Sequence, residues 1–123
     1  MVKVNKMALE ELSKDLIDKV YEAVEVAKAT GKIRKGTNET TKALEKGNAK
    51  LVVVAKDVNP PEITMHLPLL AEEKNVVCVQ VPSKEELGSS AGIDVGTGSV
   101  AIVQEGEAKN IIKEIVEKVG KKG

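Results

Sequence analysis

The segment Leu51–Ala55, with the sequence LVVVA, decides the fold. A continuous run of β-branched and other apolar residues is typical of a strand that is covered on both faces. Similar runs follow at Val76–Val81 (VVCVQV) and Ser99–Gln104 (SVAIVQ), and Lys32–Lys35 predicts a further short strand. Segments with helical periodicity alternate with these strands. The sequence therefore predicts an α/β fold, with helices on both faces of a small sheet of about four strands.

The helices are predicted from apolar spacing and from residues that favour helix ends. Within residues 8–30, apolar side chains recur every three or four residues, at Leu12, Leu16, Val20, Val24 and Ala27. Thr37 is expected to cap a helix over residues 38–46, and Ser83 to cap a short helix with Glu86 three residues later. The other predictions are helices over residues 62–66 and 69–74, opened by Pro61 and Pro68, a loop over 88–98 and a last helix over 107–119.

Length and composition exclude several classes of site. The chain has 123 residues and a mass of 13.1 kDa, which predicts a single domain over residues 1–123. It contains one cysteine (Cys78), one histidine (His66) and one aromatic residue (Tyr21). These counts exclude an internal disulfide and argue against a Cys/His zinc site and against stacking of RNA bases on several aromatic rings. No metal or cofactor is therefore expected.

Positive and negative side chains balance, with 19 Lys and Arg against 19 Asp and Glu. This balance excludes a uniformly basic nucleic-acid coat but allows a local basic patch. No run approaches the roughly 18 apolar residues of a membrane span, and the charged start differs from a signal peptide. We therefore expect a soluble, cytoplasmic protein that is a monomer when free.

No set of residues predicts catalysis. Gly31 and Gly36 have the spacing of a phosphate-binding loop, but Thr37–Asn38 stands where its lysine and hydroxyl residue should follow. His66 has apolar neighbours and is expected to be a half-buried helix residue. Cys78 lies in an apolar strand and is expected to be an inert core thiol. No pair of a nucleophile and a base therefore stands out in the sequence.

One basic segment remains as a candidate site. Three basic residues within Lys32–Lys35 lead directly into Gly36–Lys42, GTNETTK. The glycine lets a ligand approach the backbone closely, and the start of the following helix offers N–H groups to a phosphate. Asn38, Glu39 and Lys42 would share one helix face and could form hydrogen bonds with base edges. The spacing alone is equally compatible with an ordinary capped surface helix.

Five motifs, in the same order along the chain, resemble one known family. They are Gly31–Lys42 (GKIRKGTNETTK), Leu51–Ile63 (LVVVAKDVNPPEI), His66–Glu73 (HLPLLAEE), Ser83–Gly88 (SKEELG) and Ala91–Val95 (AGIDV). Together they extend over nearly the whole chain. The sequence resembles the kink-turn RNA-binding family of the archaeal large-subunit ribosomal protein L-seven-Ae.

The resemblance implies a three-layer α/β/α sandwich around a small mixed sheet, and a non-enzymatic function. Members of the family recognise the kink-turn, a sharply bent RNA element with tandem sheared G·A pairs. The implied RNA partners are 23S ribosomal RNA in the large subunit, box C/D and H/ACA guide RNAs, and ribonuclease P RNA, which is a link to tRNA processing. Core proteins of these ribonucleoproteins would join after RNA binding. Ile93 with Val95 is the archaeal pattern, which implies a role in several particles.

The functional residues of the family carry over onto matching positions of this sequence. Lys35, Gly36 and Thr37 would approach the RNA backbone at the kink. Asn38, Glu39 and Lys42 would read the G·A pairs. The remaining implied contacts are Asn59 and Ile63 around a flipped-out nucleotide, Lys84 against nearby RNA, and the loop of Ile93, Asp94 and Val95 over the kink.

Two other functions remain open from the residues alone. A small nucleotide-binding α/β enzyme would bind a mononucleotide near Gly36 or Gly96, although the missing phosphate-loop lysine argues against it. A protein-only adaptor would use the Ile93–Val95 loop as an apolar anchor, but it would leave the basic segment Lys35–Lys42 without a role. We therefore favour kink-turn RNA binding.

Overall fold

The computed structural model describes residues 14–57 and 62–119, with side chains at 14–57 and 66–118. In chain order, its elements are α2 (Lys14–Thr30), β1 (Lys32–Lys35), α3 (Thr37–Glu45), β2 (Leu51–Ala55), α4 (Glu62–Glu73), β3 (Cys78–Val81), α5 (Lys84–Ser90), β4 (Ser99–Gln104), the 3-10 turn η1 (Gly106–Ala108) and α6 (Lys109–Val119). The four predicted strands are present, although β3 begins two residues later than predicted. The predictions for residues 8–13 and 58–61 lie outside the described residues.

The strands form a mixed sheet in the order β1-β4-β2-β3. β4 is antiparallel to both β1 and β2, whereas β2 and β3 are parallel. A parallel pair needs a crossover connection, and α4 lies on the one between β2 and β3. Every residue of β2 is buried. The prediction that LVVVA is a strand covered on both faces is therefore confirmed.

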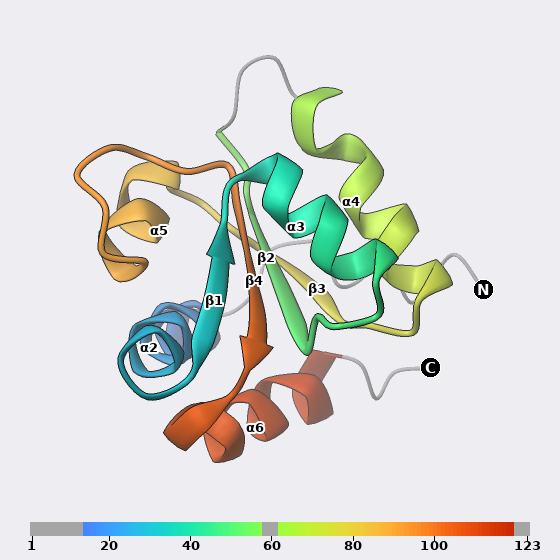
Figure 1. Ribbon diagram of the computed structural model, residues 1–123. Helices are drawn as coiled ribbons and strands as arrows, with labels where there is room; N and C mark the ends of the chain where they lie inside the picture. The colour runs from blue at the N-terminus through green and yellow to red at the C-terminus, as the bar shows by residue number, and fades with distance from the viewer. Residues whose placement is uncertain (1–13, 58–61, 120–123) are drawn as a thin grey trace.

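Helices cover both faces of the sheet and give three layers (Figure 1). α2, α5 and α6 pack on one face, where Val20 and Ile115 are fully buried. α3 and α4 pack on the other face, where Leu44 is fully buried. Successive residues of β2 alternate between the two cores, with Val52 in one and Val53 in the other. The predicted three-layer α/β/α fold with a mixed sheet is confirmed.

α4 differs from the prediction of two short helices. It runs unbroken from Glu62 to Glu73 with Pro68 inside it. Proline has no backbone N–H to donate and costs about 3 kcal/mol in a helix interior. Leu67 and Ala71 are fully buried against the sheet, and Pro68 is buried between them. This packing offsets the lost hydrogen bond, so the predicted boundary at Pro68 was wrong.

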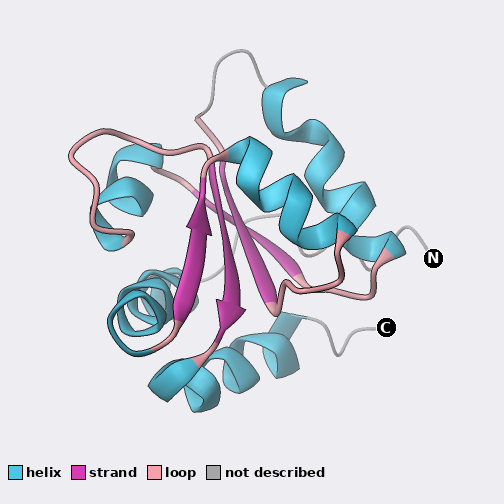
Figure 2. Cartoon of the chain, in the orientation of Figure 1, coloured by secondary structure: helices cyan, strands magenta, loops and turns pink. Residues whose placement is uncertain are grey.

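Four segments meet at one edge of the sheet. Because β1, β2 and β3 run in one direction and β4 in the other, the segments after Lys35, Ala55 and Val81 and the segment before Ser99 share this edge. It is the upper edge in Figure 2, where α3 begins and the α5–β4 loop passes beside it. The backbone N–H of Gly36 donates to the carbonyl of Ser99 at 2.9 Å. We call this region the upper edge.

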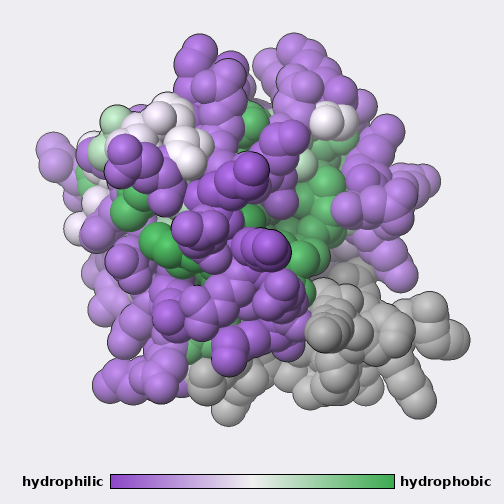
Figure 3. Space-filling model, turned by 90° about the horizontal axis from the view of Figure 1, so that it is seen from below, coloured by the Kyte–Doolittle hydropathy of each residue, from purple (hydrophilic) through white to green (hydrophobic). Residues whose placement is uncertain are grey.

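The surface is mostly polar. The face seen from below in Figure 3 is covered mainly by hydrophilic side chains, with hydrophobic ones visible between them. In the part of the chain that the structure describes, two large hydrophobic side chains are exposed, Leu69 at 67% and Val95 at 70%. None of the helices in that part is long and apolar enough to cross a membrane. Val95 belongs to the α5–β4 loop, where candidate site residues were predicted.

Candidate nucleic-acid interface

The turn between β1 and α3 places a residue without a side chain at the upper edge. Gly36 separates the strand from the helix with a φ of 95° and a ψ of 155°, a conformation that suits glycine. Gly36 is also the N-cap of α3, so the prediction that Thr37 caps this helix was wrong, and no side chain caps it. The first N–H groups of a nine-residue helix thus have no side-chain acceptor and lie at the positive end of its dipole. That arrangement suits a phosphate.

The first turn of α3 packs against β4 on one side and exposes its side chains to solvent on the other. Thr40 is fully buried, and Ser99 Oγ lies 3.4 Å from both Thr37 Oγ1 and Thr40 Oγ1. As a result, the predicted base-reading side chains share an exposed helix face next to the exposed end of β1. The exposed residues are Lys35, Asn38, Glu39 and Lys42.

The α5–β4 loop forms a second part of the upper edge. Val95 and Asp94 are exposed and Ile93 is half-buried. The N–H of Ile93 donates to the carbonyl of Gly88 at 3.0 Å. The loop comes this close because Gly88 has no side chain: a Cβ there would lie 2.2 Å from the carbonyl oxygen of Val95. The predicted exposure of this loop is confirmed for Val95 and is partial for Ile93.

Three hydrogen bonds hold the start of α5 at the upper edge. The N–H of Lys84 donates to Asp57 Oδ1 at 2.8 Å, and the carbonyl of Lys84 accepts from the N–H of Thr97 at 3.0 Å. The hydroxyl of Tyr21 donates to the carbonyl of Ser83 at 3.4 Å, and burial raises the pKa of this hydroxyl to about 12. The half-buried Lys84 therefore connects the turn after β2 to the α5–β4 loop.

Two predicted contacts involve side chains outside the described ones. Asn59 lies outside the described residues. Ile63 lies in α4, and its side chain is outside the described ones. The pocket for a flipped-out nucleotide therefore stays a prediction, whereas the other predicted residues gather at the upper edge and on the exposed face of α3.

Two lysines that the sequence analysis did not single out lie beside this site. Lys46 and Lys50 line a groove together with Glu39 and Lys42. Lys46 is one helical turn beyond Lys42, a spacing that could have indicated it from the sequence. Lys50 precedes β2, and only the packing of β2 next to β4 and under α3 brings it to the groove.

His66 lies on the surface, whereas Cys78 lies in the core. His66 is exposed, so its predicted half-burial was wrong: Leu67 faces the core, and adjacent residues of a helix point about 100° apart. His66 Nε2 lies 2.9 Å from Thr41 Oγ1, and this hydroxyl also donates to the carbonyl of Thr37 at 2.8 Å. Burial raises the pKa of the Cys78 thiol to about 12, in keeping with an inert core thiol.

The described residues contain no cluster of three or more His, Cys, Asp or Glu side chains that could hold a metal ion. The arrangement at the upper edge offers an open helix start, a face with donors and an acceptor, and an exposed apolar side chain. A ligand with phosphates, polar edges and an apolar surface would use all three.

Comparisons with known proteins identify a similar structure and a matching family. The chain is similar to a solved structure from Giardia lamblia, described as a 15.5kD RNA binding protein, with 33% sequence identity and a TM-score of 0.86. The similarity covers 94% of this chain and 96% of that one. Residues 18–112, which include the upper edge, match the Ribosomal protein L7Ae/L30e/S12e/Gadd45 family, and the chain belongs to that family.

Proposed function

We propose that this protein is a non-enzymatic RNA-binding protein that recognises and stabilises kink-turns. Membership of the family and the likeness to an RNA-binding protein of Giardia lamblia support RNA as the ligand. The observation that carries the proposal is that the uncapped start of α3 and the loop with the exposed Val95 both lie at the upper edge. A sharply bent RNA presents backbone phosphates and unstacked bases together, and these two surfaces suit both.

In this proposal, the exposed face of α3 reads the G·A pairs. The amide of Asn38 can donate and accept, the ammonium of Lys42 donates, and the carboxylate of Glu39 accepts. Guanine presents N–H donors that a carboxylate can bind. In a patch that bound phosphates alone, Glu39 would repel the ligand. Its exposure among basic residues therefore favours base recognition.

The remaining contacts surround this face. Lys35, Gly36 and Thr37 approach the backbone at the kink, where the N–H groups of the helix start add to the lysine charge. The α5–β4 loop covers the kink with apolar side chains and without an aromatic ring. We assign to this surround Lys84, Ile93, Asp94 and Val95, and in the β2–α4 connection Asn59 and Ile63.

The proposal extends to partners. The candidate RNAs are the kink-turns of 23S ribosomal RNA, of box C/D and H/ACA guide RNAs, and of ribonuclease P RNA. Core proteins of these particles would dock on the RNA-bound form of a single-domain protein. Ile93 and Val95 match the pattern of the archaeal ribosomal protein L-seven-Ae, which favours a broad role in several particles.

An equilibrium titration tests the proposal. One RNA carries a kink-turn, and the control RNA has the G·A pairs replaced by Watson–Crick pairs. At 0.15 M salt we expect the kink-turn RNA to bind at least about 1,000-fold more tightly, at the low end of the range of specific over non-specific binding. Equal affinities would overturn the proposal, and saturable binding of a mononucleotide in competition with the RNA would favour the nucleotide-binding alternative.

A further inference from the structure

A basic groove lies between β1, α3 and the end of β4, beside the proposed base-reading face. It has a volume of about 430 Å³, and its cationic lining residues are Lys32, Arg34, Lys42, Lys46 and Lys50. Among the lining residues that the structure describes, Glu39 is the one carboxylate. Glu39 and Lys42 therefore belong both to the groove and to the face that we assign to the G·A pairs.

The groove is strongly positive, whereas the whole chain has no net charge. Lys and Arg number 19 and Asp and Glu number 19 in the whole sequence, whereas the groove has five cations and one carboxylate. None of these five cations forms an ion pair within residues 14–57 and 62–119. Clustered like charges repel one another, and a bound polyanion removes that repulsion. The groove is therefore suited to a polyanion.

The two walls of the groove explain how the cations converge. On α3, Lys42 and Lys46 are one helical turn apart and share a side. On β1, Ile33 packs into the core formed with α2, so Arg34 points to the opposite side of the sheet, where α3 lies. Lys32 precedes a register shift at Ile33 and lines the same groove. Both walls thus direct positive charge into one space.

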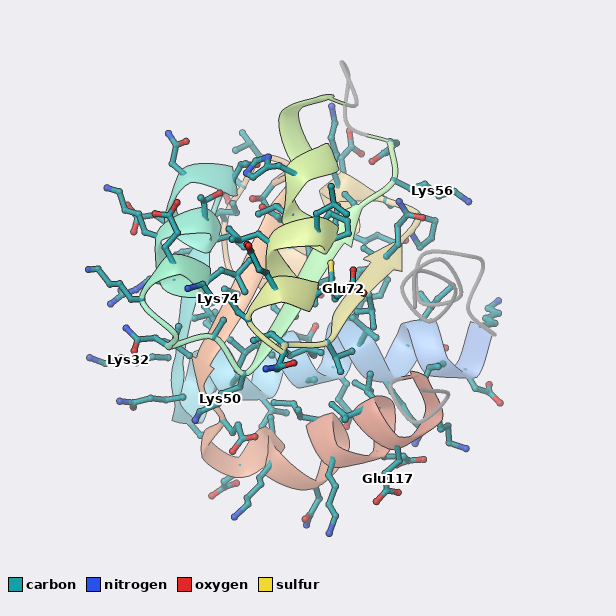
Figure 4. All side chains as sticks on the ribbon, turned by 90° about the vertical axis from the view of Figure 1, so that its right-hand side faces the viewer. Lys32, Lys50, Lys56, Glu72, Lys74 and Glu117 are labelled. Carbon is teal, nitrogen blue, oxygen red and sulfur yellow. The ribbon has the colours of Figure 1, made fainter. Side chains whose placement is uncertain are left out.

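The groove is long enough for several phosphates. From Glu39 to Lys46 the helix rises about 10 Å, roughly the length of three nucleotides along one strand. Lys32 and Lys50 lie at the end away from the upper edge, and Figure 4 shows both on the same side of the molecule. The cations therefore follow a line that starts at the base-reading residues and leads away from the kink.

We propose that this groove binds the phosphate backbone of one strand of the RNA stem that leaves the kink next to the G·A pairs. Lys46 and Lys50 are then RNA contacts that extend the interface beyond the kink. This inference rests on the proposed function, because the G·A pairs fix where the stem begins. It predicts that the length of this stem affects affinity.

The test combines a charge-removing variant with RNAs of different stem length. One kink-turn RNA has about six base pairs beyond the G·A pairs, and the other is closed by a loop directly after them. The double variant Lys46→Gln with Lys50→Gln should bind the long-stem RNA roughly tenfold or more weakly at 0.1 M salt, with a log-log salt slope lower by about 1.8. Binding of the loop-closed RNA should change less than about twofold.

The matched control is Lys113→Gln with Lys118→Gln, which removes the same charge from exposed positions of α6 on the opposite face of the sheet. This control should bind both RNAs like the wild type. No loss in the groove variant, or equal losses on both RNAs, would overturn the stem assignment. The proposed function fails separately, if the wild type does not distinguish the kink-turn from its Watson–Crick control. Melting curves verify folding, and Lys50→Gln alone provides a second, milder variant with half the slope change.

Discussion

Replacing Gly88 by alanine should displace the α5–β4 loop and so separate its role in binding from the role of α3. Gly88 is buried in α5, and an added Cβ would lie 2.2 Å from the carbonyl oxygen of Val95 and 3.1 Å from Gly96 Cα. Ordinary contact needs about 3.5 Å, so the loop must retreat by about 1 Å. The hydrogen bond from Ile93 N–H to the carbonyl of Gly88 lies in the same contact.

The cost follows from two opposing terms. Overpacking of this kind costs about 1–3 kcal/mol, while alanine favours the helix over glycine by up to about 1 kcal/mol. We therefore expect Gly88→Ala to lower the free energy of unfolding by about 1–2 kcal/mol, measured by chemical denaturation. Under the proposed function this loop covers the kink, so its displacement should lower the affinity for kink-turn RNA about tenfold, measured by titration below the melting transition.

Gly31→Ala is the matched control. Its added Cβ would lie 2.1 Å from the carbonyl oxygen of Gln104, at the end of the sheet opposite the upper edge. This variant should lose stability but keep its RNA affinity. If Gly88→Ala were destabilised in the same way and still bound RNA like the wild type, the loop would have no part in the interface.

Three further predictions address the α3 face, the loop surface and the core. Asn38→Ala and Glu39→Ala should each weaken kink-turn binding by about 1–3 kcal/mol with an unchanged melting temperature, whereas a lower melting temperature at constant affinity would mean a structural role only. Val95→Arg should change stability by no more than about 0.5 kcal/mol, because Val95 is 70% exposed. It should weaken loop-closed kink-turns more than stem-flanked ones, and an unchanged ratio of the two affinities would contradict the assignment. Burial raises the pKa of Cys78 from 9.0 to about 12, so the unfolded thiol ionises first and the free energy of unfolding should fall as pH rises above about 9. Denaturation curves from pH 7 to 11 check this, and constant stability would refute it.

The strands, and their burial on both faces, were predictable because both depend on local composition. LVVVA at Leu51–Ala55 is buried throughout, as a two-sided strand requires. The cap at Ser83 was also predictable, since its hydroxyl accepts from the N–H of Glu86 at 3.1 Å. Helix capping depends on neighbours in sequence, and such features can be read directly.

Features that depend on tertiary packing were predicted less well. Pro68 suggested a helix boundary, but burial of Leu67 and Ala71 carries α4 through it. The start of α3 was displaced by one residue because the positive φ at Gly36 makes the glycine the cap. Lys50 joins the basic groove only through the strand order, which no local pattern contains.

The exposure of the α3 face and of the loop was predictable, for different reasons. Asn38, Glu39 and Lys42 follow from helical spacing and are exposed together. The exposure of Val95 was predicted from its place in a Gly- and Ser-rich segment between an expected helix and a strand, and Val95 is exposed. The link between Lys84 and this loop needed the structure, because it passes through the backbone bond to Thr97.

The central claim is that the upper edge binds and stabilises a kinked RNA. The most direct measurement is energy transfer between dyes on the two stem ends of a kink-turn RNA during titration with the protein, in low-salt buffer without divalent ions. The account predicts a rise in transfer that saturates at one protein per RNA, as the stems are brought together, and no rise for the RNA with Watson–Crick pairs in place of the G·A pairs. Binding of both RNAs without a change in transfer, or the same change for both, would contradict it.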